Sequence, residues 1–245
     1  MKRLKRLGLP LLLALQMSGA IAAPDESLLG KEAGYPIGTA NTLGQDRFKV
    51  GSLTAMDQVF PFNPIRKGSG RFDFQRVAVE PAITYQFKGS TYSIDDYMAR
   101  QRVTGLLVIK DGEILIERYQ YGRKDSDKFY SMSMGKSITS LAIGLALSEG
   151  KIRSLDDKAA IYVPDLAGAA YGETSIRDLL RMSSGVRFSE DYSGNDDNTA
   201  MLWMSLRHGL LEFLKRYSER TAAPGERFYY ASSETTVLGF VVRGA

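Results

Sequence analysis

The chain has 245 residues, no cysteine and a single histidine, His208. The lack of cysteine excludes disulfides, thiol catalysis and cysteine-ligated metals, and one histidine argues against a zinc site, which needs two or three. Four of the 32 basic residues lie in the first 22 positions, which hold no acid, so the remainder carries 28 basic against 28 acidic residues. That balance predicts no nucleic-acid partner.

Residues 1–22, MKRLKRLGLPLLLALQMSGAIA, have the three parts of a secretory signal peptide. Basic residues begin the segment, an apolar run spans 7–15, and Ala20-Ile21-Ala22 is a small-residue cleavage site. The apolar run is shorter than the roughly 20 residues needed to cross a bilayer. We therefore expect a cleaved signal peptide, a secreted or periplasmic protein, and no stable membrane insertion after cleavage.

Residues 23–92 are expected to form an irregular N-terminal arm. Gly, Pro, Asn and Asp are frequent there, and no period of 2 or 3.6 residues persists. From residue 93 onward the sequence predicts regular structure. Ser93 can cap a helix, with Asp95 and Asp96 in its positive first turn.

Two β-rich runs, residues 106–109 and 114–119, follow that helix. They flank Lys110-Asp111-Gly112, in which Asp-Gly suits the positive φ angles of a tight turn. The pattern predicts an antiparallel hairpin.

Four helices are expected after the hairpin. Apolar residues recur at helical spacing before Gly150, a natural residue to end a helix, and Ser175 and Asp178 hold capping-box positions. The four segments are 135–150, 174–185, 202–218 and 232–245. A hairpin followed by helices predicts an α+β fold rather than a βαβ repeat.

The stretch YSMSMGKSIT, residues 130–139, could support three chemistries. A phosphate-binding loop needs a glycine where Tyr130 stands. A nucleophile elbow needs G-x-S-x-G and a triad histidine, and His208 lies inside a predicted amphipathic helix. Ser133 and Lys136 fit the third chemistry, S-x-x-K, in which a serine nucleophile is followed by a lysine one helical turn later. At the start of a helix both side chains lie on one face, and the positive end of the helix dipole favours an oxyanion. A neutral lysine can then take the serine proton.

The S-x-x-K pattern is weak evidence by itself. Ser148 and Lys151 match it as well, at a helix end where Gly150 breaks the geometry. Spacing alone leaves two interpretations of Ser133 open, a nucleophile or an ordinary serine at the start of a helix.

Three stretches of the sequence carry a family resemblance. They are SMSMGKSITSLAIGLALSEGKIRSLDD, YVPDLAGAAYGETSIRDLLRMSSGVRFSEDY and PGERFYYASSETTVLGFVV, within about residues 100–245. Together they resemble the serine β-lactamase-related hydrolases, the superfamily of class C β-lactamases, D-Ala-D-Ala carboxypeptidases and related esterases. YVPDLAGAAYG and FSEDY resemble the 6-aminohexanoate-dimer hydrolase branch. The resemblance implies a β-lactamase/transpeptidase-like fold, with an antiparallel sheet, here its N-terminal hairpin, packed on a mainly helical subdomain.

The resemblance also implies roles for particular residues. Ser133 would be the acylated nucleophile and Lys136 its proton acceptor. Tyr230, in the family's Tyr-x-Asn box, would assist proton transfer to the leaving group, although a packed aromatic residue of the FYY run is the alternative. Ser232 replaces the asparagine of that box, as in the 6-aminohexanoate-dimer hydrolase branch. This replacement weakens a β-lactamase interpretation.

The family's third motif, K-T-G or a variant such as H-x-G, has no counterpart in the sequence. KGSG at 67–70 and KGST at 88–91 have the letters in the wrong order, and HGL at 208–210 lies in a predicted helix. We therefore expect residues 93–245 to form a serine hydrolase domain that lacks its C-terminal part.

These observations predict a secreted serine hydrolase that cleaves a small amide or ester through an acyl-enzyme on Ser133, without cofactor or metal. The alternative is an inactive, truncated remnant or a binding protein on the same scaffold. Ser232, Asp191 and Trp203 are weaker candidates for substrate contacts. The acidic residues around Asp191 do not follow the sequence pattern of a calcium-binding loop, and the alternative is a solvated loop. For Trp203 the alternative is a core residue.

Overall fold

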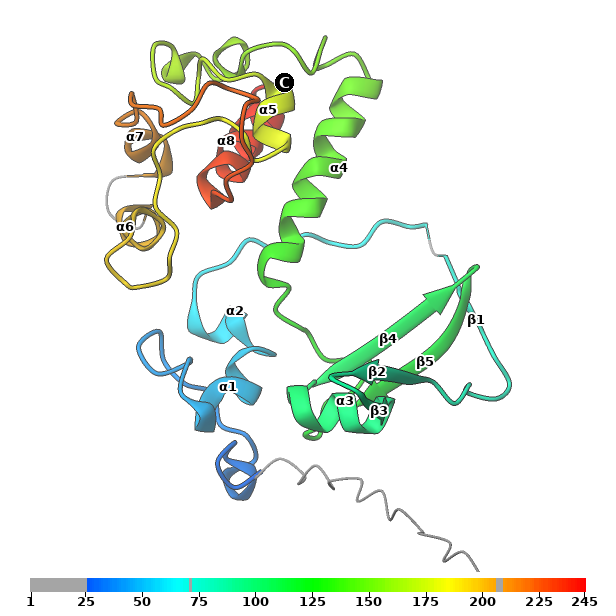
Figure 1. The fold of residues 1–245 in the computed structure, drawn as a ribbon. Coiled ribbons are helices and arrows are strands. Elements are labelled where there is room, and N and C mark those ends of the chain that lie inside the picture. Colours follow the sequence, from blue (N-terminus) through cyan, green and yellow to red (C-terminus); the bar gives the residue numbers. More distant parts are fainter. Residues whose placement is uncertain (1–25, 71, 206–208) are drawn as a thin grey trace, which may run out of the picture. The chain divides into compact units, whose positions relative to one another are not determined.

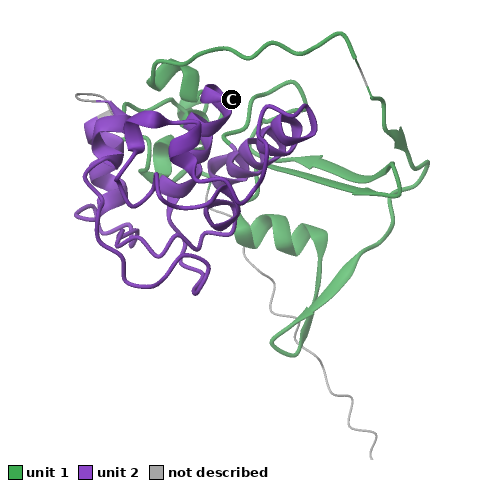
Figure 2. Ribbon diagram, turned by 90° about the horizontal axis from the view of Figure 1, so that it is seen from above, with its two compact units in different colours: residues 1–130 green, residues 131–245 purple. Residues whose placement is uncertain are grey.

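The computed structural model describes residues 26–70, 72–205 and 209–245 (Figure 1). The predicted signal peptide therefore lies outside the described residues. Two compact units divide the chain, residues 1–130 and residues 131–245 (Figure 2). Within the described ranges, every helix is too short or too polar to cross a membrane.

The first unit begins with short elements in the segment that was expected to be irregular. Leu29 and Val50 are buried in one cluster with Tyr121. Val50 belongs to the first α-helix, and this packing stabilises that helix although its sequence shows no long periodic pattern. The elements are η1 (Lys31–Ala33), α1 (Asp46–Ser52), α2 (Met56–Val59), β1 (Gln75–Arg76), β2 (Thr84–Phe87) and β3 (Ser90–Ser93).

The predicted hairpin is confirmed as β4 (Gly105–Lys110) and β5 (Glu113–Tyr119), which pair antiparallel. Asp111 and Gly112 form its turn with φ of 53° and 81°. Strand β1 adds to β5 in parallel, which gives a three-stranded sheet in the order β1-β5-β4, while β2 and β3 form a separate ribbon.

Helix α3 (Ile94–Gln101) begins where the sequence predicted a helix. The side chain of Ser93 accepts a hydrogen bond from the backbone N–H of Asp96, and the Asp96 carboxylate accepts one from the backbone N–H of Ser93. This reciprocal capping box satisfies two N–H groups that otherwise lack partners at a helix start.

The second unit packs its helices around one apolar core. Helix α8 lies beside α4 and α5 (Figure 1), and the core holds fully buried residues such as Ile143, Tyr171, Leu179 and Val237. Its elements are η2 (Met132–Met134), α4 (Gly135–Ser148), η3 (Ala159–Ile161), η4 (Pro164–Leu166), α5 (Ile176–Leu180), α6 (Asp197–Ser205), α7 (Leu210–Leu214) and α8 (Ser232–Gly244).

Two of the four helices predicted for this unit differ from the prediction. The single helix over 202–218 is wrong, because α6 and α7 are separate and Gly209 precedes α7 with φ of 84°, a conformation that no helix continues through. His208 lies outside the described residues. The helix over 174–185 is shorter than predicted, since Met182 turns to a φ of 52° after α5, although the cap of Ser175 on the N–H of Asp178 is confirmed.

Candidate active site

Ser133 lies in the short 3-10 turn η2, directly before α4. Its Oγ accepts a hydrogen bond from Lys136 Nζ at 2.9 Å and another from Tyr230 OH at 2.8 Å. The Lys136 Nζ also stands 5.2 Å from the centre of the Tyr230 ring, within the range of a cation–π contact. The three residues predicted to act in catalysis therefore meet at one point in the second unit.

The local backbone presents Ser133 at the start of a helix. Lys136 follows within the first turn of α4, so both side chains lie on one face, as the S-x-x-K spacing requires. Met132, the residue before the serine, has φ of 48°, an uncommon conformation for a residue with a side chain. Strained backbone of this kind clusters at functional sites.

Tyr230 is held by the segment that leads into α8. The backbone N–H of its neighbour Tyr229 donates to the carbonyl of Met182 at 2.8 Å, and the next residue, Ala231, is buried. Burial raises the pKa of the Tyr230 phenol, while hydrogen bonds with Lys136 and Ser133 and the charge of Lys136 lower it, and the net pKa lies below the ordinary value. The phenol is therefore more acidic than an ordinary tyrosine, which suits a group that passes a proton on.

Ser232, two residues beyond Tyr230, faces a carboxylate. Its backbone N–H donates to Glu190 Oε2 at 2.6 Å, and its Oγ donates to Glu190 Oε1 at 2.7 Å. Tyr192 OH donates to the same Oε1 at 2.9 Å. Glu190 is thus a site residue that the sequence placed only within a solvated acidic loop; the FSEDY segment was the signal that contained it.

Comparison with known proteins gives this arrangement a family. The sequence profile of the Beta-lactamase family matches residues 93–245, more than half of the chain. The chain belongs to the Beta-lactamase family. A curated 6-aminohexanoate-dimer hydrolase from Paenarthrobacter ureafaciens is 30% identical over 146 residues, which are 56% of this chain and 36% of that protein.

The first of two similar solved structures supports the fold. A Bacillus anthracis protein provisionally named 6-aminohexanoate-dimer hydrolase matches with a TM-score of 0.70 at 18% identity, over 91% of this chain and 59% of that one. A provisionally named β-lactamase from Bacteroides dorei matches with a TM-score of 0.49 at 25% identity, over 62% and 44%. The predicted family and its α+β fold are confirmed, and the chain spans between 36% and 59% of the length of the first relatives.

In this Beta-lactamase-family chain the structure gives other contacts to two of the weaker candidates, Asp191 and Trp203. The Asp191 carboxylate accepts the backbone N–H of Ser193 at 2.9 Å within its own loop. Trp203 is 58% exposed on α6, so it is not a core residue. Over the described ranges, neither side chain forms a hydrogen bond or ring contact with the three residues around Ser133 Oγ.

The acidic loop that contains Glu190 is fastened to the start of α6. Asp196 accepts N–H groups from Asp191, Tyr192 and Thr199 at 2.6 to 2.9 Å. Hydrogen bonds from the side chain and N–H of Thr199, with those from the loop N–H groups, lower the pKa of Asp196 to about 2. No three acidic or histidine side chains in the described part of the chain lie close enough together to hold a metal ion.

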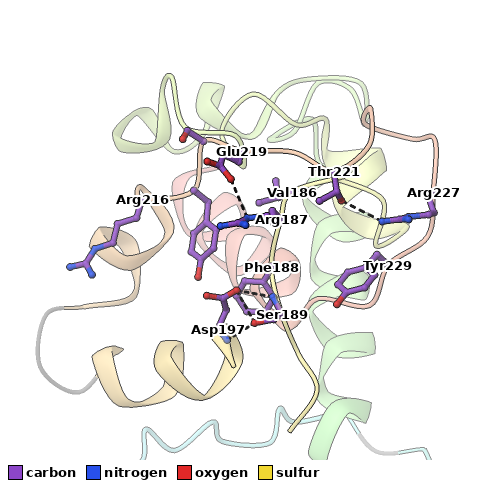
Figure 3. A pocket seen from close by; sticks show the side chains of 12 residues that line it. Val186, Arg187, Phe188, Ser189, Asp197, Arg216, Glu219, Thr221, Arg227 and Tyr229 are labelled. Carbon is purple, nitrogen blue, oxygen red and sulfur yellow. Dashed lines mark hydrogen bonds and ion pairs between the residues drawn. The ribbon is translucent and has the colours of Figure 1, made fainter. Parts of the chain in front are cut away.

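A cavity in the second unit has a volume of about 620 Å³ (Figure 3). Arg187 pairs with Glu219 across 3.1 Å in its wall, and Arg227 donates to Thr221 at 3.3 Å. Ser133 and Lys136 are not among the residues that line the cavity. Two of its lining residues, Ser189 and Tyr229, are the sequence neighbours of Glu190 and Tyr230.

Proposed function

We propose that this Beta-lactamase-family chain is a serine hydrolase that cleaves an amide or ester through an acyl-enzyme on Ser133. The observation that carries the proposal is the pair of hydrogen bonds on Ser133 Oγ, 2.9 Å from Lys136 and 2.8 Å from Tyr230. A nucleophile with a proton acceptor and a second proton carrier in hydrogen-bond reach is the arrangement that acyl transfer requires.

Each step follows from these contacts. Lys136, as a neutral amine, takes the Ser133 proton while Oγ attacks the substrate carbonyl, and the positive end of the α4 dipole stabilises the negative oxygen that forms. Tyr230 then donates its phenolic proton to the leaving nitrogen or oxygen, and the Lys136 ammonium returns a proton to the phenolate. Water then attacks the acyl-enzyme while the Lys136 amine takes its proton. Tyr230 donates a proton to Ser133 Oγ as the acyl group leaves, and the Lys136 ammonium returns a proton to the phenolate, which restores all three side chains.

The proposed substrates are short linear amides or esters. One relative is named for hydrolysis of the 6-aminohexanoate dimer, and Ser232 stands where β-lactamases carry an asparagine that holds the substrate amide. Because both Ser232 donors already contact Glu190, we rank a β-lactam below a linear amide or ester. Secretion through residues 1–22 belongs to the same proposal, and N-terminal sequencing of protein from the periplasm or medium tests it.

The test of hydrolysis uses three substrates: the 6-aminohexanoate dimer, p-nitrophenyl butyrate and a cephalosporin. We expect turnover of at least the dimer or the ester, and its loss in Ser133→Ala. Ser148→Ala is the matched control, since Ser148 belongs to the second S-x-x-K stretch and donates to the Leu145 carbonyl at 2.8 Å. Loss of turnover in the control would contradict the assignment.

The alternative is a binding protein or inactive remnant on the same scaffold. It predicts a folded protein with no turnover that depends on Ser133 and no reaction with a fluorophosphonate probe. Labelling at Ser133 would contradict this alternative.

A further inference from the structure

Helix α8 begins without a cap of its own. Its N-cap residue is Ala231, which has no side-chain acceptor, and no side-chain cap hydrogen bond forms there. The first N–H groups of a helix have no partners within the helix, and an alanine in this position is a poor cap. The missing acceptor comes from Glu190, 42 residues earlier, which takes the N–H of Ser232 at 2.6 Å.

The Glu190 carboxylate is used on both oxygens. Oε2 accepts the Ser232 N–H, and Oε1 accepts the hydroxyls of Ser232 and Tyr192 at 2.7 and 2.9 Å. Charge-assisted hydrogen bonds of this kind are about twice as strong as neutral ones. A negative charge at the positive end of α8 adds a favourable dipole interaction.

The loop that carries Glu190 is itself anchored on either side of that residue. The N–H and hydroxyl of Ser189 donate to Asp197 Oδ2 at 2.8 and 2.9 Å, and the Asp196 carboxylate accepts the N–H groups of Asp191 and Tyr192 at 2.9 and 2.6 Å. Glu190 is therefore a fixed point rather than a solvated side chain. A fixed carboxylate can transmit its position to the segment that it holds.

We propose that Glu190 is a positioning residue for Tyr230: its carboxylate fastens Ser232 and the start of α8, and so fixes the Tyr230 hydroxyl against Ser133 Oγ. Only Ala231 stands between Tyr230 and Ser232 in the chain, and its burial leaves that short link little freedom. The inference rests on the proposed hydrolase function, because positioning matters only if Tyr230 moves a proton.

Glu190 also acts on Tyr230 through its charge. The charged and titratable groups that act on the phenol are Lys136 from α4, Glu190 and Tyr192 from the loop, and the Ser133 hydroxyl bonded to it. Lys136 favours the phenolate, whereas Glu190 opposes it. Removing the Glu190 charge should therefore lower the pKa of Tyr230, an effect that a purely structural tie would not produce.

Two variants test both parts of the proposal. Glu190→Gln keeps the shape and one acceptor oxygen but removes the charge. Because Tyr230 acts in its protonated form, we expect the descending limb of the pH profile of kcat/KM to move down by about half a pH unit. Glu190→Ala removes the clamp, and we expect kcat to fall roughly 10- to 100-fold with little change in KM. Glu173→Gln is the matched control, since Glu173 also accepts a lysine and a backbone N–H, at 2.7 and 3.3 Å, away from Ser133.

The outcomes separate this inference from the function on which it rests. Wild-type turnover with an unshifted pH profile in Glu190→Gln and an unchanged kcat in Glu190→Ala would overturn the positioning role alone. The positioning role would also be overturned if Glu173→Gln lowered kcat as much as the Glu190 variants do, with an equal fall in the thermal midpoint. No turnover in the wild type, and no reaction of Ser133 with a fluorophosphonate, would instead overturn the hydrolase proposal.

Discussion

The phenolic oxygen of Tyr230 lies 2.8 Å from Ser133 Oγ, although 97 residues separate the two in sequence. Lys136 contacts both, through a 2.9 Å hydrogen bond to the serine and its position over the tyrosine ring. Proton transfer between groups at this separation needs no rearrangement. The chemistry of the site therefore depends on how α4 and the segment before α8 are held within the second unit.

Lys136→Ala should remove the proton acceptor of Ser133. We expect kcat to fall about 10²- to 10⁴-fold, the range for loss of a general base. The control is Lys151→Ala, which changes the lysine of the second S-x-x-K stretch and should leave kcat within a factor of two or so. Equal losses in both variants would show that Lys136 acts through general charge rather than as the base.

Tyr230→Phe should separate the contribution of the hydroxyl from that of the aromatic ring. The ring keeps its contact with Lys136, while the 2.8 Å hydrogen bond to Ser133 is lost, so we expect kcat to fall about 10²-fold or more with the thermal midpoint almost unchanged. Tyr229→Phe alters the exposed neighbour and should be near neutral. A fully active Tyr230→Phe enzyme would contradict the assigned role.

The pH profile should report the phenol of Tyr230. Lys136 lowers the pKa of Tyr230, so replacing the lysine by alanine should raise that pKa and move the descending limb of residual activity, where the phenol loses its proton, to higher pH. Glu190→Gln should move the limb in the opposite direction. Steady-state kinetics from pH 6 to 10 measure both shifts, and shifts of the same sign would refute this electrostatic account.

Glu234 should make the second unit less stable as the pH rises. Its side chain is only 2% exposed, and burial raises its pKa from 4.5 to about 7, against the hydrogen bonds from Ser184. The folded protein therefore keeps a proton that the unfolded chain releases. The stabilisation that this group contributes is present in full below about pH 4.5 and is lost as the pH rises through about 7. Over that range the free energy of unfolding falls by about 3 kcal/mol in all.

Glu234→Gln should flatten this dependence. We expect the thermal midpoint of the variant to fall by several degrees less than that of the wild type between pH 5 and pH 8.5. Glu173→Gln is the control, because hydrogen bonding to Lys158 lowers the pKa of Glu173 and places its titration below this window. Parallel curves for wild type and Glu234→Gln would contradict the predicted titration.

Two glycines should respond to alanine in opposite directions. Gly185 has φ of 71°, and a Cβ there would lie 2.1 Å from the carbonyl oxygen of Ala222, so Gly185→Ala should cost about 2 kcal/mol or more of unfolding free energy. Gly144, inside α4, has no heavy atom within 4 Å of an added Cβ. Gly144→Ala should therefore stabilise the protein by about 0.5 to 1 kcal/mol, as denaturant titration can show.

Local sequence signals predicted the elements that local interactions determine. Ser93 and Asp96 capped α3 as expected, and Asp111-Gly112 formed the hairpin turn. The predicted helix over 202–218 was wrong because its apolar pattern continued across Gly209, whose positive φ ends helical structure. The two-residue strand β1 carries no periodic signal, and its parallel pairing with β5 is a long-range contact.

The site residues also fall into those that local sequence could indicate and those that only long-range contacts bring together. The spacing of Ser133 and Lys136 is local and could be interpreted from the sequence, but two interpretations of it remained. Tyr230 reached the site only through the family resemblance, because no pattern in the sequence reports a contact across 97 residues. Glu190 was missed because its partners, Ser232 above all, lie far along the chain, and a composition of acidic residues suggests solvent rather than a clamp.

The most direct test of the central claim is to trap and locate the acyl-enzyme. Tyr230→Phe should slow release of the acyl group, so brief reaction with p-nitrophenyl butyrate followed by acid quenching and peptide mass spectrometry should find one butyryl group. We predict that it lies on Ser133, and that Ser133→Ala carries none. Turnover with the acyl group on another residue, or labelling that persists in Ser133→Ala, would contradict the account.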